Sequence, residues 1–195
     1  MTEQTYHQKN EGVLTYPSSG WRKAMFKWPV QLWRLGLAPL IGHNMVLITH
    51  TGRKSGLPRR TMTELHVKSG RKYAPCAFGP RAQWFRNIQA DPRVTIQTAG
   101  GAESARAVRV TSDEEILALM DYTHPIDRIM ILRYMESLDI EPTLEDILAK
   151  KDRIYWIRFD PTDEPTPPPL AADLVWVWPA VLAILAVAWL LTREK

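Results

Sequence analysis

Two tight, glycine-containing turns constrain the fold of this chain more than any other feature. They are Lys68 to Lys72, with the sequence KSGRK, and Ala99 to Gly101, with the sequence AGG. Each turn lies between two short runs of strand-forming residues, and glycine adopts the backbone angles that hairpin turns need. A hairpin joins antiparallel neighbours, whereas parallel strands need a long crossover. The sequence therefore predicts an antiparallel sheet, and it contains no βαβ series or GxGxxG motif.

Helices are expected between and beside the strands. Ser112 and Glu115 have the spacing of a capping box, and Thr143 is a suitable N-cap for the helix that follows it. The fold class is therefore α+β, a small six-stranded antiparallel barrel with flanking helices. Strands are predicted at 45–50, 60–67, 73–78, 94–98, 103–110 and 153–159, and helices at 81–90, 112–122, 126–136 and 144–150.

The segment Thr51 to Arg60, TGRKSGLPRR, concentrates positive charge between two predicted strands. Guanidinium and ammonium groups bind phosphates and carboxylates, so this turn favours an anion-binding site. The alternative is a basic turn that is merely solvated. Its polar and conformationally free residues are Gly52, Arg53, Lys54, Ser55, Gly56, Arg59 and Arg60.

Composition narrows the choice of partner. Residues 1–160 contain 23 Lys and Arg against 17 Asp and Glu, a net charge of +6, which favours an anionic ligand or membrane surface. No nucleic-acid partner is expected, because the basic residues follow no RNA-binding or helix-turn-helix pattern. The lone Cys76 excludes an internal disulfide, and the scattered histidines have no metal-ligand spacing, so no metal is expected.

The C-terminal part predicts a membrane anchor. Leu174 to Leu191 is 18 residues without a charge, about 27 Å as a helix, and a transmembrane helix is expected there; the alternative is a buried core helix. A Pro-rich linker, Pro161 to Asp173, precedes it. Because the N-terminus has no signal-peptide core, the domain that precedes the linker is expected in the cytoplasm, with the protein anchored to the membrane.

The chain thus divides into four parts. Residues 1–40 are expected to form an N-terminal amphipathic helical segment, 41–160 the barrel domain with the basic turn, 161–173 the linker and 174–191 the transmembrane helix. Within the first part, Trp21 to Leu35 has an apolar stripe with basic residues opposite it. That helix lies either on anionic lipid or on its own domain.

Four ordered segments carry a resemblance to a known family. They are VLITHTGRKSGLPRR (Val46 to Arg60), GRKYAPCAFG (Gly70 to Gly79), WFRNIQADPRVTIQ (Trp84 to Gln97) and AESARAVRV (Ala102 to Val110). Together they resemble the deazaflavin-dependent nitroreductase family. The resemblance implies a split β-barrel, frequent pairing as a homodimer, and coenzyme F420, a hydride carrier whose tail bears a phosphodiester and several glutamates.

The resemblance also implies site residues. The basic turn would bind the phosphate and tail, the following strand would run beside the ring, and a Trp-x-x-Asn signature would complete the site; a core anchor is the alternative role for its tryptophan. Three residues are available for a substrate lid, Tyr122, His124 and Tyr134, and Tyr122 is a candidate for the proton donor. The favoured alternative is that Tyr122 and Tyr134 are surface helix residues and that His124 is a turn residue before Pro125. The implied cofactor-binding residues are Arg53, Lys54, Ser55, Arg59, Arg60, Thr61, Met62, Ala77, Phe78, Gly79, Trp84 and Asn87.

Three functions follow as expectations. The first is an F420-dependent oxidoreductase that transfers a hydride to an electron-poor acceptor, a membrane quinone or a nitro compound. The second is a split-barrel oxidoreductase that binds FMN instead, whose phosphate would use the same turn. The third is a non-catalytic, membrane-tethered module that binds an anion or lipid headgroup.

Overall fold

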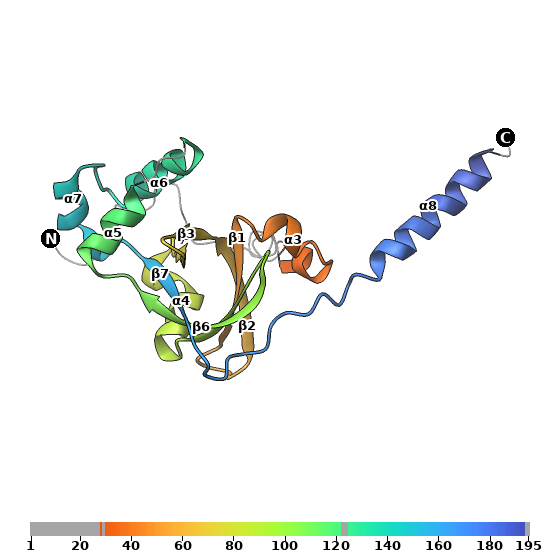
Figure 1. The fold of residues 1–195 in the computed structure, drawn as a ribbon, viewed down its shortest axis with the longest axis horizontal. Helices are drawn as coiled ribbons and strands as arrows, with labels where there is room; N and C mark the ends of the chain where they lie inside the picture. Colours follow the sequence, from red (N-terminus) through yellow and green to blue (C-terminus); the bar gives the residue numbers. More distant parts are fainter. Residues whose placement is uncertain (1–27, 29, 122–124, 194–195) are drawn as a thin grey trace.

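The computed structural model describes residues 28, 30–121 and 125–193 of the chain (Figure 1). One antiparallel sheet of seven strands occupies its centre, in the order β2-β1-β5-β6-β7-β4-β3. The strands are β1 (Met45–Thr51), β2 (Pro58–Glu64), β3 (His66–Lys68), β4 (Arg71–Pro75), β5 (Arg93–Thr98), β6 (Gly101–Arg109) and β7 (Trp156–Pro161). The helices are α3 (Ala38–Ile41), α4 (Gln83–Ala90), α5 (Asp113–Met120), α6 (Pro125–Ser137), α7 (Leu144–Ala149) and α8 (Val177–Arg193), with short 3₁₀ turns at Gly79–Arg81 and Lys151–Arg153.

Both predicted hairpins are confirmed, but the six-stranded barrel is wrong. The sheet is open and has seven strands, because the predicted strand 60–67 divides at Leu65 into β2 and β3. β2 pairs with β1, whereas β3 pairs with β4, so these two strands become opposite edges of the sheet. The edge strand β2 approaches β4, the neighbour of the other edge, where the Thr63 hydroxyl donates to the Pro75 carbonyl at 3.3 Å. A barrel closes through a ladder of backbone hydrogen bonds. This single hydrogen bond from a side chain does not replace such a ladder, so the sheet stays open.

Helix α4 covers the inner face of the sheet. Alternate residues of β1, among them Val46 and Ile48, are fully buried in a core cluster with α4, to which the helix contributes Trp84, Phe85 and Ile88. Each large apolar side chain buried in this way stabilises the fold by about 1.5–3 kcal/mol. Because α4 packs on β1, the first turn of the helix lies beside the loop that connects β1 to β2.

Helices α5, α6 and α7 form a second core cluster at one end of the sheet (Figure 1). It is built around Trp156 and Tyr73 of neighbouring strands β7 and β4. The predicted N-caps are confirmed: the Ser112 hydroxyl accepts from the Glu115 amide, and the Thr143 hydroxyl accepts from the Asp146 amide, both at 3.2 Å. These bonds satisfy amides that the first helical turn leaves unpaired.

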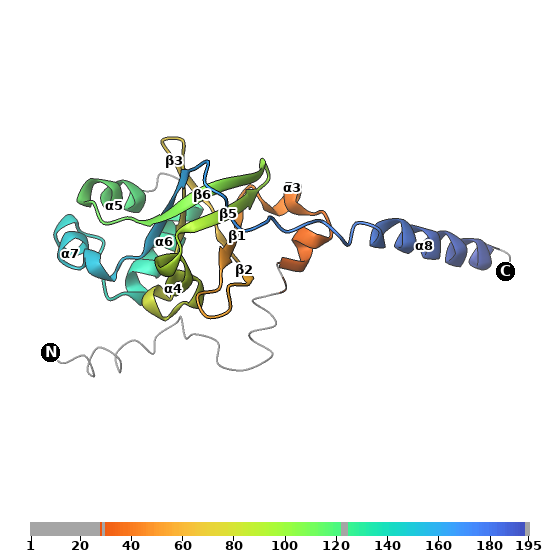
Figure 2. The same ribbon diagram turned by 90° about the horizontal axis from the view of Figure 1, so that it is seen from below.

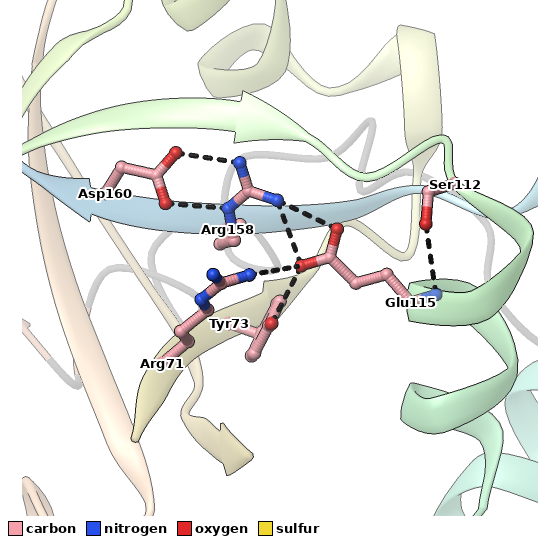
Figure 3. A network of polar contacts seen from close by, with 6 residues as sticks. All are labelled: Arg71, Tyr73, Ser112, Glu115, Arg158 and Asp160. Atoms are coloured by element: carbon pink, nitrogen blue, oxygen red, sulfur yellow. Dashed lines mark hydrogen bonds and ion pairs between the residues drawn. The ribbon is translucent and has the colours of Figure 1, made fainter. Parts of the chain in front are cut away.

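The carboxylate of Glu115 has a different role from the one a capping box gives it. It accepts from the Tyr73 hydroxyl at 2.8 Å and from the Arg158 guanidinium at 2.8 and 3.0 Å (Figure 3). Arg158 also holds Asp160 through two bonds, and this pairing lowers the pKa of the Asp160 carboxyl. The network ties α5 to β4 and β7, so we assign it a structural role.

The Pro-rich segment, residues 162–173, lies across the outer face of the sheet and is here called the strap. The Thr166 hydroxyl bonds to the Thr95 hydroxyl at 2.7 Å, and the Gln97 amide bonds to both backbone groups of Leu170, at 2.6 and 3.1 Å. Further contacts join Glu164 to Arg106. A segment without secondary structure is therefore fixed by side chains of β5 and β6.

The predicted transmembrane helix over Leu174 to Leu191 is not supported. No helix in the described part of the chain is both long and apolar enough to cross a membrane. Helix α8 has 17 residues and begins only at Val177, because the preceding residues form a turn bound to the N-terminal segment. In that turn Asp173 pairs with Arg34 at 2.7 Å, and the Leu174 amide donates to the Arg34 carbonyl at 2.9 Å.

Helix α8 projects away from the sheet in both views (Figure 2). Its first turn is fixed by the Trp178 indole, which donates to the Leu35 carbonyl at 2.8 Å. Most of the amphipathic helix predicted over Trp21 to Leu35 lies outside the described residues, and residues 30–34 are helical.

Candidate anion-binding site

The basic turn connects β1 to β2 as a tightly curled loop. The Gly52 amide donates to the Leu57 carbonyl at 2.9 Å, which closes the loop across its base. A Cβ atom at Gly52 would lie 2.9 Å from the Ser55 hydroxyl oxygen and 3.1 Å from that carbonyl, so a side chain there would require both groups to shift. Gly56 has a positive φ of 66° that glycine adopts readily. The two glycines thus determine where the turn presents its cations.

Arg53 is held in place by the first turns of α4. The Asn87 side-chain oxygen accepts from the Arg53 Nη1 at 2.9 Å and from its backbone amide at 3.2 Å. The Gln83 oxygen accepts from Nη2 at 3.0 Å. Both partners are neutral, so neither compensates the positive charge of the guanidinium, and the side chain remains exposed. Because the group is oriented in advance, an anion that binds it loses less conformational entropy.

Arg59 and Arg60 lie on opposite faces of β2. Arg59 is opposite His50 in the β1–β2 register and bonds to the Ser55 hydroxyl at 3.4 Å, on the side that carries Arg53. Arg60 is on the other side, since neighbouring side chains of a strand alternate. The pKa of Asp173 is lowered mainly by Arg34, and Arg60 lowers it further. The structure therefore groups Arg53, Ser55 and Arg59, and separates Arg60 from them.

The remaining predicted site residues are distributed more widely. Lys54 is exposed in the turn, and Thr61 and Met62 are half-buried on opposite faces of β2. Phe78 packs against the first core cluster, and Trp84 is a buried member of it. The other residues of this group are Ala77, which is half-buried, and Gly79, which is buried.

The predicted lid residues give a mixed result. Tyr122 and His124 lie outside the described residues. Tyr134, expected as a surface helix residue if it were not in a lid, is instead buried at 8% exposure. Its hydroxyl oxygen accepts from the Tyr155 amide at 3.1 Å, and burial raises its pKa. Tyr134 therefore belongs to the second core cluster and is not accessible to a substrate.

His50 is a buried polar residue beside the basic turn that sequence reasoning missed. It is 2% exposed, and burial lowers its pKa to about 4, so the imidazole is neutral at neutral pH. Its Nδ1 lies 3.2 Å from the Asn87 side-chain nitrogen, and its Nε2 has no hydrogen-bond partner within the described residues. An unpaired buried donor or acceptor costs about 1–3 kcal/mol. The sequence placed His50 at the end of a predicted strand but indicated nothing about its partner.

A hollow of about 200 Å³ adjoins the other side of the turn. Its charged residues, Asp91 and Arg93, pair with each other through bonds of 2.9 and 3.1 Å. Because these charges compensate one another, the hollow offers less attraction to an anion than the exposed Arg53 does. The other lining residues are Thr51, Gly56, Pro58, Pro165, Pro167 and Pro168.

Comparison with known proteins bears on this site. Residues 35–124 match the F420H(2)-dependent quinone reductase family. The matched region contains the basic turn, α4 and His50, and the match supports an F420-dependent oxidoreductase in broad terms. It gives no support to the FMN alternative, and no curated protein matches the chain.

Several solved structures are similar to the chain at low identity. An F420-H2-dependent reductase, FDR-A, is 21% identical over 60% of this chain and 94% of its own, with a TM-score of 0.37. A putative 5-nitroimidazole antibiotic resistance protein from Bacteroides thetaiotaomicron is 11% identical over 68% and 80%, with a TM-score of 0.41. The haem storage protein HutZ from Vibrio cholerae is 11% identical over 76% and 98%, with a TM-score of 0.35. Identities this low do not transfer an activity.

Gly79 should tolerate alanine less well than Gly70. Both have positive φ, 46° and 75°, which costs an alanine about 1–2 kcal/mol. A Cβ at Gly79 would also lie 3.0 Å from the Tyr155 ring, whereas none of the described atoms lies within 4 Å of one at Gly70. We expect Gly79→Ala to reduce the free energy of unfolding by at least about 1 kcal/mol more than Gly70→Ala does, measured by urea denaturation. Equal losses would contradict the contact with Tyr155.

Proposed function

We propose that this chain is an F420-dependent oxidoreductase that passes a hydride from reduced coenzyme F420 to a quinone. The observation that carries the proposal is the preoriented guanidinium of Arg53, bonded to Asn87 and Gln83 and exposed beside Arg59 and Ser55. A phosphodiester with several glutamates needs fixed cations and hydroxyl donors, and this arrangement supplies both. The matched family supports the same cofactor and acceptor class.

The proposed contacts divide between the two parts of the coenzyme. Arg53, Lys54, Ser55 and Arg59 would bind the anionic tail. Arg60 is left out of this group because it lies on the other face of β2. The ring would lie against three half-buried residues that the family resemblance implies, Thr61, Ala77 and Phe78, together with the backbone at Gly79. Met62 is left out because it lies on the same face of β2 as Arg60.

The reduced deazaflavin, when bound, supplies the hydride. A quinone that accepts this hydride and one proton becomes a hydroquinone. The chain contributes by binding and orienting both reactants, since proximity and alignment lower the barrier without a covalent step. Water or Tyr122 supplies the proton in this proposal. Nitro compounds are further acceptors of the same two-electron chemistry. The proposal also includes assembly of the protein as a homodimer.

Titration of the full chain with coenzyme F420 tests the proposal directly. We expect saturable binding, and reoxidation of the reduced coenzyme when a menaquinone analogue is added, followed by its absorbance. Binding should weaken as salt is added, because exposed charges are screened. No binding of either redox form would contradict the proposal. A purified protein that is yellow with a flavin spectrum would instead identify FMN as the cofactor.

A further inference from the structure

Asn87 connects Arg53 to His50. The asparagine is 6% exposed on α4, and its side-chain oxygen accepts from the Arg53 guanidinium at 2.9 Å. The nitrogen of the same amide lies 3.2 Å from Nδ1 of His50 on β1. A buried side chain thus bridges the exposed cation of the candidate site to a neutral imidazole beneath it.

The donor and acceptor atoms of the three side chains determine the direction of each hydrogen bond between them. A guanidinium only donates, so the amide atom that faces Arg53 is the oxygen. The NH₂ group of Asn87 therefore faces His50, and Nδ1 must accept from it. The proton of the neutral ring is then on Nε2, the atom that has no partner within the described residues.

We propose that His50 is a positioning residue of the anion site, which holds the Asn87 amide in the orientation that directs the Arg53 guanidinium toward the coenzyme. This inference rests on the proposed function for its ligand. Without an acceptor at Nδ1, the buried NH₂ group of Asn87 loses this partner, and only the bonds from Arg53 still hold the amide in its orientation. The flipped amide would present NH₂ to the guanidinium, and two donors repel each other.

Two variants at His50 and one matched control test the proposal. His50→Leu removes the acceptor, and we expect the Kd of the full chain for coenzyme F420 to rise about fivefold, the usual worth of one hydrogen bond. His50→Asn places an amide oxygen near the position of Nδ1, and we expect a Kd within about twofold of the wild type. Thr49→Val is the control, because Thr49 is the neighbouring buried residue of β1 and its hydroxyl is likewise unpaired within the described residues. It should leave the Kd unchanged.

A double-mutant cycle separates positioning from a general effect on stability. In an Arg53→Ala background, His50→Leu should change the Kd no further, because the group it positions is gone. A full fivefold effect in that background, or in Thr49→Val alone, would overturn the proposal. If the wild type binds the coenzyme and His50→Leu binds it equally well, the positioning role fails while the proposed function stands. If the wild type does not bind, the proposed function itself fails.

The tautomer gives a readout that needs no coenzyme. Nitrogen NMR of the free protein at neutral pH should show His50 neutral, with its proton on Nε2 and an unprotonated Nδ1. The opposite tautomer would make Nδ1 a donor facing the NH₂ of Asn87, which contradicts the proposed chain of bonds. In Asn87→Ala we expect the His50 signals to shift, whereas Gln83→Ala, which removes the other Arg53 partner, should leave them in place.

Discussion

Replacing Arg53 by alanine should raise the Kd of the full chain for coenzyme F420 about 10- to 100-fold. A hydrogen bond to a charged group contributes about 1.5–3 kcal/mol, and 1.4 kcal/mol is a factor of ten in binding. The loss should be near the upper end because Asn87 and Gln83 orient this guanidinium before the ligand arrives. Fluorescence titration at fixed ionic strength would measure it, since the salt concentration alone changes such affinities.

Arg60→Ala is the matched control. It removes the same charge from the same basic segment, but Arg60 lies on β2 and faces away from Arg59. We expect its effect on the Kd to be no more than about threefold, the size of a screened, long-range charge effect. Equal losses in the two variants would indicate that only the net charge of the turn attracts the coenzyme. That result would contradict a site built from oriented groups.

Replacing Trp156 by alanine should have the largest effect on stability. This side chain is fully buried in the second core cluster, with its ring edge-on to His66 and Tyr134 at centroid distances of 4.8 and 6.4 Å. Tryptophan or phenylalanine to alanine in a core costs about 3–5 kcal/mol. Domains of this size are stable by about 5–15 kcal/mol, so the variant should lose a substantial part of its stability. Urea denaturation followed by circular dichroism would measure the change.

Leu144→Ala serves as its control, because this leucine is at the first position of α7 and is 62% exposed. It should change the free energy of unfolding by less than about 1 kcal/mol. Trp156→Phe should lie between the two, since it retains an aromatic ring in the cluster. A loss below about 1 kcal/mol for Trp156→Ala would mean that α5, α6 and α7 do not depend on this residue for their packing against the sheet.

Local signals in the sequence predicted local structure well. The hairpins at Gly70 and Gly101 form as expected, because the φ values of 75° and 110° depend only on the turn itself. The caps at Ser112 and Thr143 form for the same reason, since each satisfies an amide three residues away. The sequence could not predict that Glu115 would turn from the helix start to Arg158, because that bond joins residues 43 positions apart.

The division of the predicted strand 60–67 into β2 and β3 shows a second limit of prediction from the sequence. A run of eight residues from 60 to 67 has strand-forming composition throughout, and nothing in it requires a break at Leu65. The break arises because one half pairs with β1 and the other with β4. Pairing partners are a property of the whole chain, so a continuous pattern in the sequence became two strands at opposite edges.

The structure of the C-terminal region was predicted from its composition alone. Composition carries no information on the contacts that this region makes with the rest of the chain. An uncharged run of 18 residues predicted a spanning helix, yet Asp173 and Leu174 bind Arg34 and shift the start of the helix to Val177. The prolines predicted an extended linker, and residues 162–173 contain no helix or strand. Its attachment to Gln97 and Thr95 depends on side chains about 70 positions earlier.

For the candidate site, the sequence by itself determined the chemistry: a glycine-bounded turn rich in guanidinium groups, beside a Trp-x-x-Asn segment, with the cations that an anionic ligand needs. Only the tertiary structure decided which cations act together. Alternation along β2 sends Arg59 and Arg60 to opposite faces, and the packing of α4 on β1 brings Asn87 to Arg53 and His50, which lie 34 and 37 positions away in the chain. Residue type sets what a group can bind, but its orientation comes from partners that the fold brings together from distant parts of the chain.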